Sequence, residues 1–236
     1  MEVIKVAYIL LGAPAFDKYS DRLERFGFTP VALPPEGRVN ATVCTHADTL
    51  IFACGGEYAA NADYVRTLPS FLHKYFITTD ETPQGGYPTD AVFNALVVSG
   101  KLFAKLNTLS GAVLCIAKKN GLTPVNVRQG YARCSTLALD KVNAAVTADE
   151  GMARAMVAHG VDVLRISAGH IALRGCEYGF IGGASFVDET SRRVFFFGDL
   201  HAHPDGARIE AFLAHHGYSA VSMDGVLTDF GGAVIV

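Results

Sequence analysis

Short apolar runs recur along the chain at intervals of about 45 residues. Five of them have the composition of β-strands: Val6–Leu10, Leu50–Ala53, Ala95–Val98, Ala144–Thr147 and Val194–Phe197. Each is followed by a helix-like stretch, and then usually by a glycine and a second short apolar run. A fixed interval of this size indicates one supersecondary unit that is used repeatedly.

The stretches after these runs have the spacing or the end signals of helices. They are Ala15–Phe26, Ala59–Tyr75, Leu102–Asn120, the segment from Asp149 or Glu150 to His159, and the segment from Pro204 to His216. The second apolar runs follow a glycine at Gly27–Val31, Gly121–Val125, Gly160–Leu164 and Gly217–Val221. Each unit therefore predicts a strand, a helix and a second strand.

Short junctions connect one unit to the next, and most contain glycine. Three of them include a further strand-like run: Ala91–Phe93, Leu137–Leu139 and Ala184–Val187. The C-terminal run Ala233–Val236 supplies a fourth, and we expect it to pair with the first unit. Such pairing would close a ring and remove the exposed edges that an open array of sheets would leave.

Composition limits the class of protein. The chain has 236 residues, 50% of them hydrophobic, and no polar linker interrupts the repeats, so we expect a single domain over residues 1–236. A net charge of −3 predicts no nucleic-acid partner, and no apolar stretch is long enough to span a membrane. The five cysteines lack a compact disulfide spacing, which favours the reducing cytoplasm.

The repeats and the glycine pairs Gly182-Gly183 and Gly231-Gly232 resemble the pentein superfamily of guanidino-group-modifying enzymes. The resemblance covers nearly the whole chain. It implies an α/β fold, a five-bladed pseudo-fivefold α/β propeller built from five repeats of about 45 residues. The segment Ile166–Asp205 further resembles an uncharacterised bacterial family of that fold, with which no activity is associated.

The sequence His46-Ala47-Asp48-Thr49 lies in the first junction. In the arginine deiminase branch of the penteins, a His-x-Asp-Thr sequence in this setting carries the catalytic histidine. Alternation along an extended segment would place His46 and Asp48 on one face, where the carboxylate raises the pKa of the imidazole. The alternative is a junction histidine that bonds to a backbone carbonyl.

Cys134 is the cysteine that lies in a junction beside an arginine and hydroxyl residues. Pentein enzymes attack a guanidinium carbon with a thiolate, and the nearby Arg133 would lower the pKa of this thiol. The sequence departs from the pentein pattern, because in those enzymes the nucleophile follows a glycine pair near the end of the chain. Here Gly231-Gly232 is followed by Ala233, so a small buried thiol is the alternative for Cys134.

Five carboxylates lie in or near the junctions: Asp90, Asp140, Glu177, Asp188 and Asp229. A guanidinium ligand pairs best with two carboxylates. We expect Asp90 and Glu177 to provide them, with Asp48 as a further substrate-binding residue, and we expect Asp140 and Asp188 to be solvated turn residues.

The segment Asp199-Leu200-His201-Ala202-His203 has the alternating histidines of a zinc-dependent phosphoesterase. Only about 30 residues remain for further ligands, and the segment falls at a strand-to-helix turn. We therefore expect turn residues here, and neither a metal nor a cofactor.

Two functions remain open. The first is a hydrolase or amidino-group enzyme for a small cationic molecule that carries a guanidine or amidine, with His46 as general acid and base, Cys134 as nucleophile and Asp90 and Glu177 holding the cation. The second is a non-catalytic pentein, a binding or translation-associated factor like the anti-association initiation factor of this fold, or a small-molecule sensor. The His-x-Asp-Thr sequence favours the first, and the missing cysteine after the last glycine pair favours the second.

Overall fold

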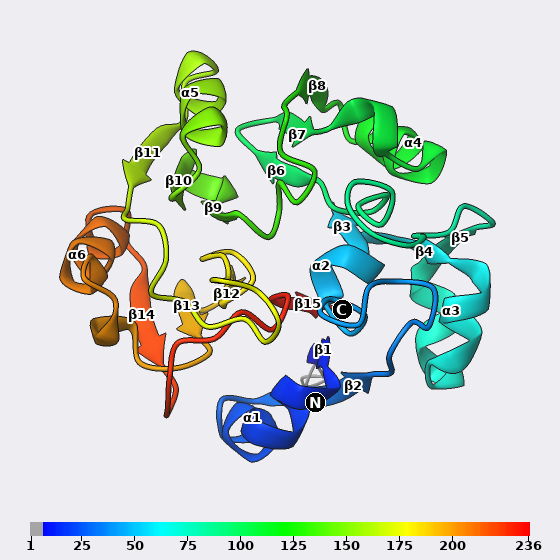
Figure 1. Cartoon of the computed structure of the whole chain (residues 1–236), viewed down its shortest axis with the longest axis horizontal. Helices are drawn as coiled ribbons and strands as arrows, with labels where there is room; N and C mark the ends of the chain where they lie inside the picture. The colour runs from blue at the N-terminus through cyan, green and yellow to red at the C-terminus, as the bar shows by residue number, and fades with distance from the viewer. Residues whose placement is uncertain (1–6) are drawn as a thin grey trace, which may run out of the picture.

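The computed structural model describes residues 7–236 of the chain. It contains five small sheets of three strands each. Within every sheet the middle strand pairs antiparallel with one neighbour and parallel with the other. The sheets follow one another around a common centre, with helices mostly on the outside (Figure 1).

The sheets are as follows, each with its middle strand in the middle. The first is β15 (Ala233–Ile235), β1 (Ala7–Gly12), β2 (Phe28–Leu33); the second is β3 (Phe52–Cys54), β4 (Glu57–Asn61), β5 (Phe76–Thr79); the third is β6 (Leu96–Val98), β7 (Lys101–Ala104), β8 (Thr123–Asn126). The fourth is β9 (Thr136–Leu139), β10 (Ala144–Thr147), β11 (Asp162–Arg165), and the fifth is β12 (Ser185–Asp188), β13 (Arg193–Phe196), β14 (Ser219–Ser222).

A helix connects the middle strand of each sheet to its parallel partner. These helices are α1 (Ala13–Arg25), α3 (Ala62–Thr67), α4 (Gly111–Lys119), α5 (Glu150–Ala158) and α6 (Gly206–His215). The remaining helical segments are short: α2 (Ala47–Leu50) and the 3-10 turns η1 (Ser70–Tyr75), η2 (Leu106–Thr108), η3 (Asp140–Val142) and η4 (Leu200–Ala202). None of the helices in residues 7–236 is both long and apolar enough to cross a membrane.

The expected C-terminal pairing is confirmed. Ile235, Val234 and Ala233 lie opposite Ile9, Leu10 and Leu11 in an antiparallel ladder. The last strand of the chain therefore completes the first sheet. Of the predicted opening strand, Val6 lies outside the described residues, and the remainder corresponds to β1.

The predicted order of elements is wrong in the second and third units. The runs Leu50–Ala53 and Ala95–Val98 overlap the first strands β3 and β6, and the middle strands β4 and β7 follow within stretches that were expected to be helical. Alanine and leucine in those stretches favour helix by propensity. The tight turns at Gly55-Gly56 and Ser99-Gly100, whose residues all have positive φ, instead fold each pair of strands into a hairpin.

One junction strand is also wrong, because Ala91–Phe93 forms turns rather than a strand. Its side chains are nevertheless needed for packing, since Phe93 is buried against Phe52 and Leu102 of the neighbouring strands. Burial of an apolar run thus does not require strand geometry. The runs Leu137–Leu139 and Ala184–Val187 do form strands, as β9 and β12.

The core lies between adjacent units rather than inside any one of them. The largest aromatic group joins the first unit to the last: Phe28 and Tyr19 pack on Phe186, Phe195 and Phe197. Because each sheet has only three short strands, no unit can bury enough apolar surface alone. The junctions between the sheets converge near the centre, and the candidate site is built from them.

Candidate functional site

His46 lies at the start of the short helix α2, which corrects the expected extended segment. The helix keeps Asp48 close to His46 even though strand alternation does not apply. The backbone N–H of Asp48 donates to the carbonyl of Gly231 at 3.0 Å. The first and last junctions of the chain are therefore tied together at this point.

Cys134 lies in the turn between β8 and β9. The backbone N–H of Ser135 donates to the carbonyl of Tyr131, which forms the turn, and the N–H of Gly183 donates to the carbonyl of Cys134 at 2.9 Å. These bonds fix the backbone on both sides of the thiol. The side chain of Cys134 is 5% exposed.

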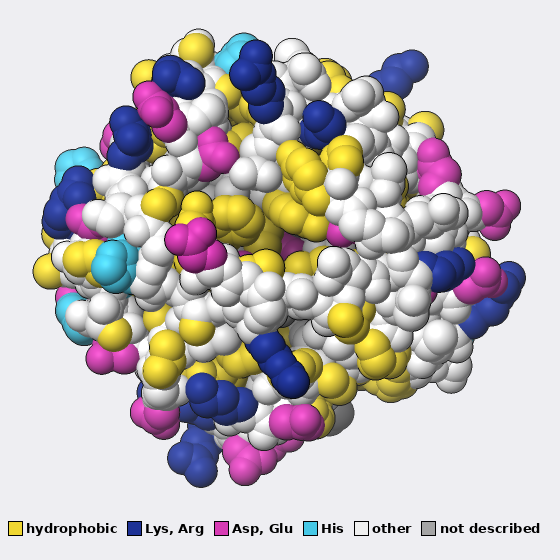
Figure 2. All heavy atoms as spheres, in the orientation of Figure 1, with side chains coloured by type: hydrophobic (Ala, Val, Ile, Leu, Met, Phe, Trp, Pro, Cys, Tyr) yellow, Lys and Arg dark blue, Asp and Glu magenta, His cyan; other side chains and the backbone are white. Residues whose placement is uncertain are grey.

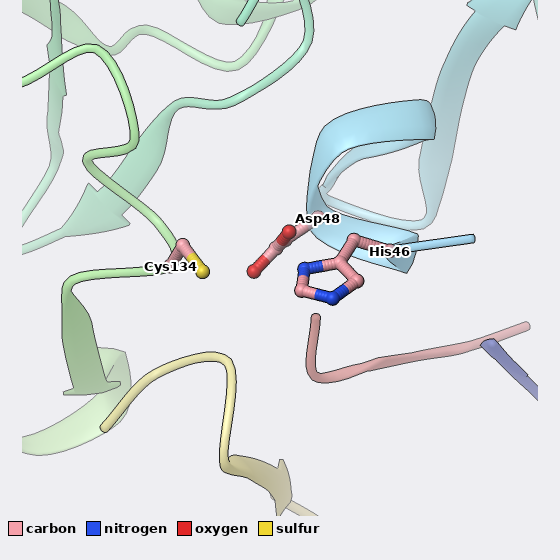
Figure 3. Close-up of side chains that lie close together, drawn as sticks. All are labelled: His46, Asp48 and Cys134. Carbon is pink, nitrogen blue, oxygen red and sulfur yellow. The ribbon is translucent and has the colours of Figure 1, made fainter. Parts of the chain in front are cut away.

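The structure brings His46, Asp48 and Cys134 together from two distant junctions. One ligand atom from each lies within 4.8 Å of the others, and the three side chains point toward one another (Figure 3). Asp229 completes the cluster from the last junction. Its carboxylate lies 3.7 Å from Nδ1 of His46 and 3.5 Å from Sγ of Cys134.

Asp229 was named among the junction carboxylates but was not singled out from the sequence. Backbone N–H groups hold it in place: Phe180 donates to Oδ2 and Gly231 to Oδ1, each at 2.9 Å. Its position directly before Phe230-Gly231-Gly232 was the available signal, since a glycine pair marks close approach of the backbone.

Glycines make room for this cluster. A Cβ on Gly231 would lie 2.2 Å from Cβ of His46, and one on Gly183 would lie 1.9 Å from Oδ1 of Asp229. Both distances are far shorter than any van der Waals contact. The glycine pairs that suggested the fold therefore serve the site directly, because only a residue without a side chain allows the approach.

The charges in the cluster oppose further negative charge. Burial, together with the neighbouring Asp229 and Asp48, raises the pKa of the Cys134 thiol well above its usual value. Burial raises the pKa of Asp48 and raises that of Asp229 to about 6. Burial lowers the pKa of His46 despite the neighbouring Asp48. The expectations of an acidic thiol and a more basic imidazole are therefore wrong for the free protein.

Two cavities reach the cluster from outside. One of about 360 Å³ is lined by Cys134, Asp229, Tyr131 and Glu177, and another of about 580 Å³ by His46, Asp229 and Arg174. The same face in space-filling form is hollowed near its centre, with hydrophobic side chains around the hollow and acidic atoms inside it (Figure 2). A small ligand could therefore approach the thiol and the imidazole.

The remaining predicted residues are placed differently. Asp90 is fully buried and does not line either cavity; its Oδ2 accepts a hydrogen bond of 2.6 Å from the hydroxyl of Tyr131, which does. Asp90 thus contacts the site only through Tyr131. Glu177 is exposed at the cavity wall, away from the buried cluster. Asp188 accepts hydrogen bonds from Thr190 and Ser191, as expected for a turn residue.

The segment Asp199–His203 forms the turn that was expected. His201 lies 3.4 Å from Glu210, and Nδ1 of the buried His203 accepts from the backbone N–H of Asp205. Within residues 7–236, the group with the spacing of metal ligands is His46, Asp48 and Cys134, and it does not include these histidines.

Comparison with solved structures identifies the fold as that of the penteins. Two structures of dimethylarginine dimethylaminohydrolase match, an adduct with 4-chloro-2-hydroxymethylpyridine and a histidine-to-glycine variant as an adduct with S-methyl-L-thiocitrulline. Each match covers 92% of this chain and 92% of the other, at 12% identity, with TM-scores of 0.55 and 0.52. At this identity the likeness establishes the fold alone.

The chain belongs to the family of unknown function DUF6873, whose model matches residues 13–234. No curated protein sequence matches it. Family membership therefore brings no activity with it, and the function has to be inferred from the site.

Proposed function

We propose that this protein is a thiol-dependent hydrolase or amidino-group enzyme that acts on a small cation carrying a guanidine or amidine. The observation that carries the proposal is the buried thiol of Cys134 between an imidazole and two carboxylates, at the floor of a cavity. The pentein fold supports the same class of chemistry by analogy.

The electrostatics favour a cationic substrate. In the free site the carboxylates of Asp48 and Asp229 raise the pKa of the Cys134 thiol. A guanidinium that binds between them would form charge-assisted hydrogen bonds and offset their negative charge. The thiol pKa would then fall, so that the nucleophile ionises only when the substrate is present.

The reaction would use each of the four side chains. Sγ of Cys134 adds to the guanidinium carbon, and His46 takes the thiol proton and gives it to the departing nitrogen, which leaves as an amine. Water then adds to the same carbon, the C–S bond breaks, and the sulfur recovers a proton. The products are an amine and a ureido compound, or an amide when the substrate is an amidine.

Asp90 and Glu177 have secondary roles in this proposal. Asp90 fixes the hydroxyl of Tyr131 on the cavity wall, and Glu177 attracts the cation at the rim. Asp48 and Asp229 replace them as the pair that holds the guanidinium. The alternative of a non-catalytic binding factor does not account for a buried thiol and imidazole that face each other.

Two further features belong to the proposal. The pairing of β15 with β1 and the succession of sheets in Figure 1 support a closed, pseudo-fivefold propeller of five repeats. The five free cysteines support a reducing compartment such as the cytoplasm.

S-methyl-L-thiocitrulline is a suitable probe, because attack by a thiolate on its isothiourea carbon expels methanethiol, which a thiol-specific dye detects. We expect release with the wild type and none with Cys134→Ala. With His46→Ala we expect a covalent adduct on Cys134 that mass spectrometry detects in the intact protein. A panel of guanidines and amidines, assayed for released amine, would then define the substrate.

Cys115→Ala serves as the matched control, since this exposed cysteine lies on α4 away from the cluster. Equal methanethiol release by the wild type and Cys134→Ala would contradict the proposal. So would the absence of both release and adduct across the whole panel.

A further inference from the structure

The cluster of His46, Asp48, Cys134 and Asp229 has a second property that substrate chemistry does not require. Nδ1 of His46 and Oδ2 of Asp48 are buried without any hydrogen-bond partner, although both side chains are more than nine-tenths buried. Buried polar atoms without a partner are rare and costly. Two of them pointing into one cluster indicate that something is normally bound between them.

The spacing of the four side chains fits a metal ion. Around tetrahedral zinc, neighbouring nitrogen, oxygen and sulfur ligands lie about 3.4–3.6 Å apart. Oδ1 of Asp229 lies 3.7 Å from Nδ1 of His46, and Oδ2 lies 3.5 Å from Sγ of Cys134. Asp48 offers its free oxygen from the same group of ligand atoms within 4.8 Å. Small side-chain adjustments would bring all four atoms to one ion.

The donor set selects the metal. One thiolate, one imidazole and two carboxylates suit Zn²⁺, whereas Mg²⁺ and Ca²⁺ prefer oxygen ligands alone. The ligand charge of the thiolate and two carboxylates is also what makes this site unfavourable when it is empty. A divalent cation would remove the repulsion that raises the pKa of Cys134 and Asp229.

The surroundings hold the ligands in position. The backbone N–H groups of Phe180 and Gly231 donate to the carboxylate of Asp229, and such outer contacts orient a ligand and tune its affinity. Gly183 and Gly231 leave no room for a Cβ beside Asp229 and His46. The arrangement is therefore fixed by the backbone rather than by flexible side chains.

We propose that Zn²⁺ binds at this cluster, with Nδ1 of His46, Sγ of Cys134 and one carboxylate oxygen each of Asp48 and Asp229 as ligands. The bound ion occupies the thiol and the imidazole together. Zinc and a substrate that reacts with Cys134 therefore exclude each other, and zinc holds the enzyme in an inactive state.

The test uses the full chain, freed of metal by a chelator, and no guanidine. Zinc titration followed by calorimetry should give one site per chain. Cobalt(II) added to the metal-free protein should give the intense near-ultraviolet band of a thiolate–cobalt bond and the visible bands of a tetrahedral ion. Cys134→Ser should abolish the ultraviolet band and weaken zinc binding by about 100-fold or more, since even outer-contact losses cost 10–100-fold.

Cys115→Ser is the control and should bind zinc like the wild type. A thiolate band that persists in Cys134→Ser, or equal zinc affinity in both proteins, would overturn the assignment. If Cys134→Ser does not fold, X-ray absorption of zinc-loaded wild type addresses the same point, with one sulfur ligand expected and a shell of nitrogen and oxygen alone as the contrary result.

The inference does not depend on the proposed hydrolysis. Zinc binding is measured without substrate, and methanethiol release is measured without zinc, so either can fail alone. If both hold, zinc at saturating concentration should stop methanethiol release, and a chelator should restore it. Release that continues unchanged with zinc bound would contradict mutual exclusion.

Discussion

At the scale of single residues, burial decides the chemistry of the site. His46, Asp48, Cys134 and Asp229 are each at most 5% exposed, and burial is the largest cause of the pKa shift of every one of them. All four shifts favour the neutral form. The free site is thus poised to accept positive charge, whether from an organic cation or from a metal ion.

This charge state predicts a pH dependence of cation binding. The pKa of Asp229 is raised to about 6, so its carboxyl is largely neutral below that pH and ionised above it. Because a guanidinium binds the ionised form, its affinity should rise as the pH increases from 5 to 7 and then level off. Calorimetric titration with a guanidine that binds, at several pH values, measures this.

Asp229→Asn provides the comparison for that experiment. Its residual affinity should be weak and nearly independent of pH between 5 and 7, because the titrating carboxyl is absent. Affinity that falls with rising pH in the wild type would show that Asp229 does not hold the cation.

At the scale of elements, the junctions carry more information than the helices and strands. Each helix is specified locally, as α5 illustrates: Asp149 accepts from the backbone N–H of Met152 at its start, and Gly160 follows its last turn with a positive φ. The junctions have no such periodic pattern. Their conformation is set by glycines and by backbone bonds to other junctions.

Gly231→Ala tests this role of a junction. The new Cβ would lie 2.2 Å from that of His46, and φ at this position is +78°. We expect a loss of roughly 2–4 kcal/mol in unfolding free energy, from overpacking and backbone strain together, and loss of zinc and cation binding. Denaturant unfolding and calorimetry provide the two measurements.

Gly121→Ala is a suitable control because its φ is +67° but no atom lies within 4 Å of the added Cβ. Only backbone strain remains there, worth about 1–2 kcal/mol, and binding at the site should be unchanged. Equal effects of the two substitutions would mean that the contact with His46 is not limiting.

At the scale of the whole molecule, the pairing of β15 with β1 joins the two ends of the described chain. Tyr8 and Val236 exchange backbone hydrogen bonds of 3.2 and 2.8 Å beyond the ladder, and Val234 is buried against Leu10 and Leu50. The first sheet cannot be complete until synthesis of the chain is finished. The last junction, with Asp229 and Gly231, is held in place by the same pairing.

Deletion of residues 233–236 should therefore destabilise the entire domain. Exposing the apolar side chains of Val234 and Ile235 and an unpaired edge should cost about 3–5 kcal/mol, a fall of about 10 °C in the unfolding temperature. Val234→Ala keeps the ladder and should cost less, about 1–2 kcal/mol. A deletion that leaves the unfolding temperature unchanged would rule out a structural role for this strand.

Sequence patterns alone predicted most of the units but not every strand within them. The first, fourth and fifth units follow the expected strand, helix and strand, because Ala7–Gly12, α1 and β2 alternate in ways that depend on local burial and on caps such as Gly27. In the second and third units, β4 and β7 have helix-favouring residues, and only pairing with β3 and β6 makes them strands. Propensity gives way to tertiary contacts at such positions.

The sequence by itself determined the repeat, the glycine pairs and the candidates His46 and Cys134, since each is a local pattern of residue types. The tertiary structure alone decided that Asp229, 95 positions from Cys134, lies against the thiol, and that Asp90 faces Tyr131 instead of the ligand cavity. It also reversed the expected thiol pKa. Proximity, burial and the sum of neighbouring charges arise only when distant junctions meet at the centre, and no local pattern encodes them.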